Sequence, residues 1–244
     1  MNDGVPRGTL GTVHNASLLL DLLSSGPSHH ALTDLAERSD MSLPTVHRLL
    51  RSLVAAGLVE QDPSSSRYGL GHELVRLAEH YLARSSVLKA AGPYLVELRN
   101  STRATVVLAI LVGDEAVYID RIDGDDAGGV YRDGSRIRPP LSCAAGRLLL
   151  AHADDGTWNR VAGDDVEQGL RDKWRTSDTL LFVPDPPIGQ AEIAAPVRDA
   201  EGNIRAAVAV IDYTAAPDGE RLERDVAHQL TRTANAISRT PGHG

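Results

Sequence analysis

The first 70 residues carry the strongest constraint on the fold, because they divide into short segments with a fixed order of periodicities. Apolar residues recur at helical spacing over 13–23, 33–39 and 43–56, and turn-forming residues separate the three segments. Two short runs of strand-forming residues follow at 58–60 and 67–70, around a polar loop. Three helices and a hairpin in this order are typical of a winged helix-turn-helix domain.

The third predicted helix has the features of a helix that reads DNA in the major groove. Its apolar residues Val46, Leu49, Leu50 and Leu53 share one face, so polar side chains occupy the other faces. A serine at the predicted N-cap is suited to a phosphate, and an arginine is the best single residue for guanine. The hairpin adds candidate contacts to the DNA backbone. The candidate DNA-binding residues are Ser42, Pro44, Thr45, His47, Arg48, Arg51, Arg67 and Tyr68.

The net charge of −8, from 25 Lys+Arg and 33 Asp+Glu, excludes a general polyanion binder. Residues 1–84 hold seven arginines and nine acidic residues, a charge of −2, which leaves −6 for residues 85–244. Arg48, Arg51 and Arg67 nevertheless fall in the predicted third helix and hairpin. One such module would bind DNA weakly, so we expect a dimer that places two modules on a two-fold symmetric site.

The pattern changes to mixed helices and strands after residue 71. Residues 72–86 are predicted to form one amphipathic helix that connects two domains. Strands are predicted at 105–112, 116–122, 191–197 and 204–213 and near Val130-Tyr131, and helices at 94–100, 147–152, 166–175 and 219–238. We therefore expect an α+β protein with a winged helix-turn-helix domain over 1–71, a linker helix over 72–86 and an α/β domain over 87–244.

Several strings carry a resemblance to one family. They are Leu32-Thr33-Asp34-Leu35-Ala36, Thr45-Val46-His47-Arg48-Leu49-Leu50, Gly57-Leu58-Val59, Tyr68-Gly69-Leu70-Gly71, Pro139 to Leu150, and Ile193-Ala194-Ala195-Pro196-Val197. Together they resemble the IclR family of bacterial transcriptional regulators. The resemblance implies a repressor or activator with a winged helix-turn-helix, a linker helix and a GAF-like α/β effector-binding domain. It also implies double-stranded operator DNA and a small-molecule effector as partners, and assembly as a homodimer or homotetramer.

The sequence departs from the family pattern at three places. Ser42-Leu43-Pro44 stands where the family often has Pro-Lys-Ser, which removes a basic residue and a hydroxyl from the helix start. Asp40 replaces the turn glycine, and a short polar residue tolerates a left-handed backbone. The segment between His152 and Glu192 is shorter than usual, which predicts a smaller or more open wall for the effector domain.

The resemblance also implies where an effector would bind. Small residues at a helix start let backbone N–H groups approach a ligand closely, which suits a carboxylate, although tight packing of a helix on a sheet needs the same residues. An acidic side chain in the pocket would oppose an anionic effector unless it is protonated or paired with an arginine, so we expect an effector that is apolar or only partly anionic. The residues carried over are Ser142, Cys143, Ala144, Ala145, Gly146, Phe182, Gln190, Glu192, Ala209 and Ile211.

Two other classes of function remain open from the residues. Cys143 at a helix start has the setting of an activated nucleophile, but no histidine and carboxylate stand at a recognisable spacing, so we do not expect an enzyme. A winged-helix domain can also serve as a scaffold for protein contacts. No metal-ligand spacing or phosphate-binding loop is visible, so no metal or cofactor is expected. The single cysteine, the lack of a secretory signal and the short apolar runs predict a cytosolic protein without membrane spans.

Overall fold

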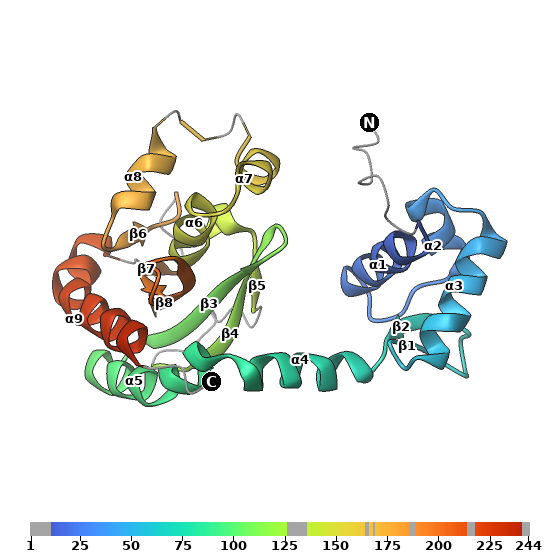
Figure 1. The fold of residues 1–244 in the computed structure, drawn as a ribbon, viewed down its shortest axis with the longest axis horizontal. Helices are drawn as coiled ribbons and strands as arrows, with labels where there is room; N and C mark the ends of the chain where they lie inside the picture. Colours follow the sequence, from blue (N-terminus) through green and yellow to red (C-terminus); the bar gives the residue numbers. More distant parts are fainter. Residues whose placement is uncertain are drawn as a thin grey trace. The chain divides into compact units, whose positions relative to one another are not determined.

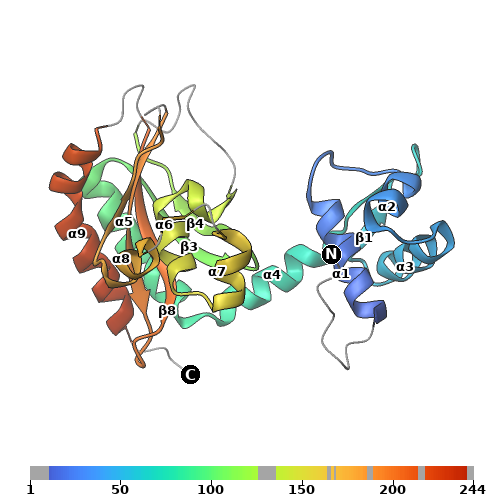
Figure 2. The same ribbon diagram turned by 90° about the horizontal axis from the view of Figure 1, so that it is seen from above.

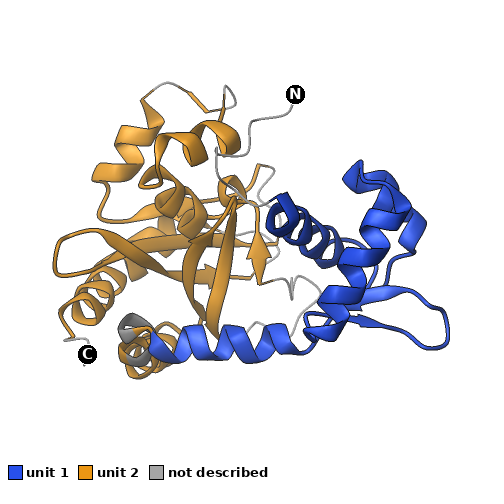
Figure 3. Ribbon diagram, turned by 45° about the vertical axis from the view of Figure 1, so that its right-hand side comes forward, with its two compact units in different colours: residues 1–84 blue, residues 85–244 orange. Residues whose placement is uncertain are grey.

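The computed structural model describes residues 11–125, 136–163, 166–167, 169–185, 189–213 and 218–240. The chain divides into two compact units, residues 1–84 and residues 85–244 (Figure 3). The first unit holds helices α1 to α4 and a two-stranded hairpin, and the second holds a six-stranded sheet with its helices (Figure 1). The expected strand near Val130 lies outside the described residues.

The N-terminal unit is built around one small apolar core. Residues such as Leu19, Leu35 and Leu50, one from each of the first three helices, are fully buried against each other. Strand β2 pairs antiparallel with β1, and His30 forms a bridge to Tyr68 that ties the segment before α2 to the hairpin. The elements are α1 Gly11–Ser24, α2 Leu32–Ser39, α3 Leu43–Ala55, β1 Val59–Gln61, β2 Tyr68–Leu70 and α4 Glu73–Arg84.

Two turns in this unit show why particular residues stand there. Asp40 closes α2 with φ of 53°, so the expected left-handed turn between the second and third helices is confirmed. Gly71 lies against the chain at Gly57, and a Cβ atom on Gly71 would sit 2.1 Å from the Gly57 carbonyl oxygen. Only glycine permits this approach of two backbones, which joins the hairpin to the start of α4.

Helix α4 differs from the other helices of its unit because none of its residues is buried. Its sequence is amphipathic, yet Val75 is 65% exposed and Tyr81 is 66% exposed, with Leu77 also exposed between them. The described chain therefore leaves the apolar face of α4 without a covering surface.

The C-terminal unit is an antiparallel sheet with the strand order β5-β4-β3-β8-β7-β6. The long central strands are almost entirely buried, as expected for a sheet covered on both faces. Its elements are α5 Ser86–Thr102, β3 Thr105–Val112, β4 Glu115–Ile122, β5 Ile137–Arg138, the 3-10 helix η1 Pro140–Ser142, α6 Ala144–Ala151, α7 Asp155–Val161, α8 Leu170–Thr176, β6 Leu180–Phe182, β7 Ala191–Arg198, β8 Ile204–Asp212 and α9 Gly219–Arg239.

Each face of the sheet has its own apolar core. Helices α5 and α9 cover one face, where Leu95 and Leu230 pack with alternate residues of the strands such as Val208. Helix α6 covers the other face, where Leu148 packs with the intervening strand residues such as Ala209. Figure 2 shows α5 and α9 on one side of the strands and α6 and α7 on the other. The expected α+β architecture is confirmed.

Some element boundaries differ from the sequence prediction. The helix expected at 94–100 is the longer α5, and the helix expected at 166–175 is α8, which begins at Leu170. Helix α7 and strands β5 and β6 were not predicted. Trp158 of α7 and Trp174 of α8 meet edge to face with ring centres 6.0 Å apart, so the two tryptophans pack α7 against α8.

Candidate DNA-binding surface and effector site

Helix α3 buries one face and presents basic side chains on another. Its buried residues are Val46, Leu49, Leu50 and Leu53, the four that the periodicity predicts. His47, Arg48 and Arg51 are exposed. In the described part of the chain, no carboxylate lies within ion-pair distance of Arg48 or Arg51, whereas Arg38 pairs with Asp34 and Arg76 pairs with Glu73. The two arginines of α3 therefore keep their full capacity to pair with phosphates or bases.

Two hydroxyl groups are hydrogen-bonded to each other at the start of α3. Ser42 is the N-cap residue, but its Oγ lies 2.8 Å from Thr45 Oγ1 and caps no backbone N–H group. Pro44 occupies the first turn, where its missing N–H would have no partner within the helix. Ser42 and Pro44 are exposed and Thr45 is half-buried. The Thr45 and Val46 N–H groups donate to the Ser42 carbonyl oxygen at 2.9 Å and 3.0 Å, so the first turn of α3 is closed by the backbone of its own N-cap residue.

Shallow grooves flank the exposed face of α3. One of about 520 Å³ runs between α3 and the hairpin and is lined by His47, Arg51, Val54, Ala55, Gln61 and Tyr68. Another of about 320 Å³ lies along α3 itself, over His47, Arg48, Arg51, Ser52 and Ala55. Tyr68 is only 4% exposed and packs in the core of the unit, because β2 turns its ring inward. Tyr68 thus differs from the expected DNA contact, because its ring packs in the core and offers almost no surface to DNA.

The loop of the hairpin is ordered by one aspartate. Asp62 accepts hydrogen bonds from the Ser64 backbone N–H at 2.9 Å, from Ser64 Oγ at 2.8 Å and from Ser65 Oγ at 2.5 Å. These donors, Ser65 first, lower the pKa of Asp62 to about 2. Arg67 follows the loop with its side chain exposed. The loop therefore presents Arg67 from an ordered turn, in which hydroxyl and amide donors are hydrogen-bonded to the negatively charged Asp62 carboxylate.

We predict that an NMR titration of the Asp62 carboxyl will give a pKa of about 2, below its ordinary value of 3.8. A lowered pKa in the folded state means that the loop stabilisation is fully present above pH 3.8 and is lost as the pH falls through 2. Ser65→Ala should move the pKa back toward the ordinary value, and Ser25→Ala, an exposed serine elsewhere in the unit, should not. An unchanged titration in Ser65→Ala would contradict this account of the loop.

In the C-terminal unit, the strand register brings the candidate effector residues to one face. Phe182 of β6 pairs with Glu192 of β7, which pairs with Ile211 of β8, and these three form one row across the sheet. Ala209 stands in the next row on the same face. Cys143, Ala144 and Ala145 lie over this face at the start of α6. Gln190 is buried just before β7, and Ser142 is half-buried in η1, where its Oγ donates to the Pro139 carbonyl oxygen.

Glu192 is fully buried and both of its carboxyl oxygens are engaged. The Ala145 backbone N–H donates to Oε1 at 2.8 Å, and the Tyr118 hydroxyl donates to Oε2 at 2.8 Å. Burial raises the pKa of Glu192 above its ordinary value, while the two hydrogen bonds act in the opposite direction. Burial, followed by the negative charge of Glu192, also raises the pKa of Tyr118. The Glu192 carboxyl group thus lies at the start of α6.

The small residues at 143–146 have a packing role as well. A Cβ atom on Gly146 would lie 2.5 Å from the Pro140 carbonyl oxygen and 2.8 Å from Cys143 Sγ. The first turn of α6 therefore requires a glycine where it packs against the backbone of η1. Phe182 stacks beneath the Arg147 guanidinium, whose carbon lies 4.5 Å from the ring centre. Gly146, Phe182 and Arg147 thus have packing contacts of their own on this face.

The chain matches the profiles of two known protein domains. The profile of the IclR helix-turn-helix domain matches residues 12–63, and that of the bacterial transcriptional regulator IclR C-terminal domain matches residues 79–170, together more than half of the chain. The chain belongs to the IclR family. It is therefore an HTH-type transcriptional regulator with a C-terminal effector-binding domain, and the expectation drawn from the sequence strings is confirmed.

Relatives of known name agree over almost the whole length of this IclR-family chain. The HTH-type transcriptional regulator XynR of Escherichia coli K12 is 26% identical, over 95% of this chain and 97% of its own. The regulator KdgR of the same strain is 29% identical over 87% of this chain and 86% of its own. The crystal structure of an IclR transcriptional regulator from Alicyclobacillus acidocaldarius is 26% identical, covers 94% of this chain and 98% of its own, and superposes with a TM-score of 0.74.

Cys143 of this IclR-family member does not have the environment of a nucleophile. The thiol is fully buried, and burial followed by the charge of Glu192 raises its pKa to about 12. We predict that a thiol reagent at neutral pH will modify the native protein far more slowly than the protein unfolded in urea. Cys143→Ser in urea should show no reaction and so serves as the blank. Equal rates in the native and unfolded states would contradict this burial.

Tyr118 is the site residue that sequence patterns left undecided. Alternation along a strand could not assign the faces of Tyr118, Arg121 and Tyr131, and a register shift between Leu108 and Ala109 interrupts the pairing of β3 with β4. The Tyr118 ring is turned toward Glu192. Arg121 pairs with Asp123 at 2.7 Å and lies over the ring of Tyr213, while Tyr131 lies outside the described residues.

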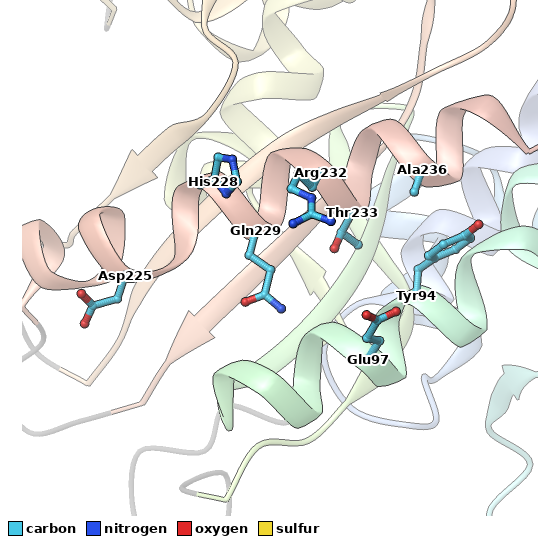
Figure 4. Close-up of a pocket in the computed structure, with 8 residues that line it drawn as sticks. All are labelled: Tyr94, Glu97, Asp225, His228, Gln229, Arg232, Thr233 and Ala236. Carbon is cyan, nitrogen blue, oxygen red and sulfur yellow. The ribbon is translucent and has the colours of Figure 1, made fainter.

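A further groove of about 490 Å³ opens on the other face of this IclR-type domain, between α5 and α9 (Figure 4). Acidic and basic side chains both line it, so it has no preference for one sign of charge. The lining residues are Tyr94, Glu97, Asp225, His228, Gln229, Arg232, Thr233 and Ala236. The sheet separates this groove from Glu192.

Among the described residues, every helix is too short or too polar to span a bilayer. No three histidine, cysteine or acidic side chains of that part of the chain gather closely enough to hold a metal ion.

Proposed function

We propose that the chain reads operator DNA with the exposed face of α3 and with Arg67 beside the hairpin loop. The observation that carries the proposal is the presence of two exposed arginines, Arg48 and Arg51, without an ion-pair partner in the described chain. Arg48 lies one turn into α3, at the position from which a recognition helix contacts base edges. The hydroxyl groups of Ser42 and Thr45 would contact a phosphate. His47 and Arg51 would contact the flanking backbone.

The regulator acts as a homodimer or as a dimer of dimers. The N-terminal unit is net acidic, so a single copy has too few cations for strong binding at physiological salt. The exposed face of α4 is evidence for a dimer. Its Val75, Leu77 and Tyr81 form an apolar face that nothing in the described chain covers, and a second copy would cover it. Two copies would present two α3 helices to half-sites related by two-fold symmetry.

The C-terminal unit senses a small molecule on the face of the sheet beneath α6. The residues proposed to surround the effector are the row Phe182, Glu192 and Ile211 together with Ala209, Gln190 and the segment 142–146. A signal requires that the effector bind two states of the dimer with different affinities. We also propose that the protein works in the cytoplasm, where bacterial DNA lies, and that it does not catalyse a reaction.

The test is a binding selection with the purified full-length protein on random DNA fragments, followed by gel retardation at several salt concentrations. We expect a palindromic site whose half-sites lie about one helical turn apart. Analytical ultracentrifugation should show a dimer or tetramer under the same conditions. Retention of every fragment with equal affinity, or none at low salt, would reject DNA reading and favour a scaffold for protein contacts.

A further inference from the structure

We propose that Glu192 is an internal ligand that fills the carboxylate-binding place at the start of α6, so that this regulator excludes small carboxylates and responds to effectors that lack one. The inference deepens the proposed function and rests on it, since it concerns the effector site of the same domain. It makes Glu192 a specificity-determining residue, and it names the chemical group that the effector does not carry.

The geometry of the carboxyl group is the first support. One oxygen accepts from a backbone N–H in the first turn of α6, and the other accepts from the Tyr118 hydroxyl, both at 2.8 Å. Two donors from different elements, one on each oxygen, form the arrangement that binds a carboxylate. The backbone N–H groups of a first helical turn also favour negative charge. The donors are therefore saturated by a group of the chain itself.

The setting of Glu192 in β7 is the second support. It is flanked by Ala191 and Ile193 and followed by Ala194 and Ala195, all completely buried, and its own side chain has no contact with solvent. A buried carboxyl group is costly to fold into a protein unless its oxygens are hydrogen-bonded. An apolar residue would suit strand packing alone, so the carboxyl group has a role that the sheet does not require.

The consequence for ligand choice follows from charge. A second carboxylate on this face would meet the buried carboxyl group of Glu192, and the two groups would compete for the same Ala145 and Tyr118 donors. Replacing Glu192 by alanine removes Cγ, the carboxyl carbon and both oxygens, which is the skeleton of acetate. The alanine variant should therefore acquire a site for acetate that the natural protein lacks.

The experiment measures the thermal unfolding of the full-length protein in sodium acetate and in sodium chloride at equal ionic strength. Glu192→Ala should melt about 5 °C or more below the natural protein, because two buried donors lose their acceptor. Acetate should restore at least half of that loss and leave the natural protein unchanged. Acetamide, which has the same shape without the charge, should restore less. The Ala145 amide resonance should move back toward its natural position as acetate is added.

Two variants serve as matched controls. Glu192→Gln keeps the space filled and should not respond to acetate. Leu148→Ala opens a buried space in the same helix without these donors, so it should lose stability and gain none from acetate. If Glu192→Ala does not fold, Glu192→Ser, which leaves less empty space, replaces it. Equal effects of acetate and acetamide, an equal response of Leu148→Ala, or no response in a folded Glu192 variant would overturn the proposal.

The outcome is separable from that of the proposed function. Acetate rescue and the Ala145 resonance are measured without DNA, so they can succeed even if the protein selects no operator. Conversely, a selected operator with no acetate rescue would keep the regulator and reject the internal ligand. If both hold, acetate should change the operator affinity of Glu192→Ala at least several-fold and that of the natural protein not at all.

Discussion

Arg48→Ala is expected to abolish specific retardation of the selected operator while leaving the fold intact. Arg48 is exposed on α3 and has no ion-pair partner in the described chain, so its removal empties no core and frees no carboxylate. A bidentate arginine on guanine contributes ~1–3 kcal/mol of discrimination, and a dimer uses two such contacts. The affinity for the operator should fall by roughly 30-fold or more, while binding to unrelated DNA changes little.

The matched control is Arg205→Ala in the C-terminal unit. Arg205 is an exposed arginine paired with Asp199, so its removal changes the net charge equally without touching α3. Arg51→Ala offers a second comparison, since a phosphate contact should weaken all sequences alike and reduce the salt dependence. Quantitative gel retardation across a salt series would distinguish the three variants. Operator binding by Arg48→Ala at the natural affinity would move the reading surface away from α3.

Gly71→Ala is expected to unfold the N-terminal unit locally, with a loss of about 3 kcal/mol in its free energy of unfolding. The added Cβ atom would lie 2.1 Å from the Gly57 carbonyl oxygen and 2.8 Å from the Leu58 carbonyl carbon. These are backbone atoms, and moving them would break two hydrogen bonds. One runs from Gly71 N–H to the Leu58 carbonyl oxygen at 2.8 Å, and the other from Glu73 N–H to the Gly57 carbonyl oxygen at 3.3 Å. The junction between the hairpin and α4 cannot relax cheaply.

Amide hydrogen exchange of the full-length protein would locate this effect. Protection should fall across β1 and β2 in Gly71→Ala, DNA retardation should disappear, and protection in the central strands of the C-terminal unit should remain. Gly11→Ala is the control, because a Cβ atom there would have no neighbour within 4 Å. Unchanged protection in the hairpin of Gly71→Ala would show that the junction has more freedom than its contacts imply.

The sequence predicted the N-terminal unit more closely than the C-terminal one, for physical reasons. Helix α3 has a four-residue apolar face and clear end signals, so its core side could be assigned from periodicity alone. Helix α7 has only seven residues, too few for a periodic pattern, although Asp154 caps it by accepting from the Thr157 N–H. Strands β5 and β6 have two and three residues, and they do not pair with each other around one polar loop as the equally short β1 and β2 do.

The candidate sites divide in the same way. Exposed arginines on α3 follow directly from the helical period once its apolar face is known. Arg67 and Tyr68 both lie beside the hairpin loop, which makes both of them candidate DNA contacts in the sequence. The Tyr68 ring is only 4% exposed and packs in the core, because adjacent side chains of a strand point to opposite faces. Glu192 stood out as an acidic residue in an apolar strand. Its partner Tyr118 could not be found from the sequence, since the contact joins residues 74 positions apart across an irregular pairing.

The bare apolar face of α4 has a consequence for how a signal could cross the protein. A helix of 12 residues is marginally stable alone in water. None of the residues of α4 is buried, so packing within the described chain does little to stabilise this helix. In the proposed dimer, the copy that covers Val75, Leu77 and Tyr81 would also stiffen the connection between sensing and DNA reading. Dissociation and melting of the linker would then be one event, and a dilute monomer would sense its effector without transmitting anything to α3.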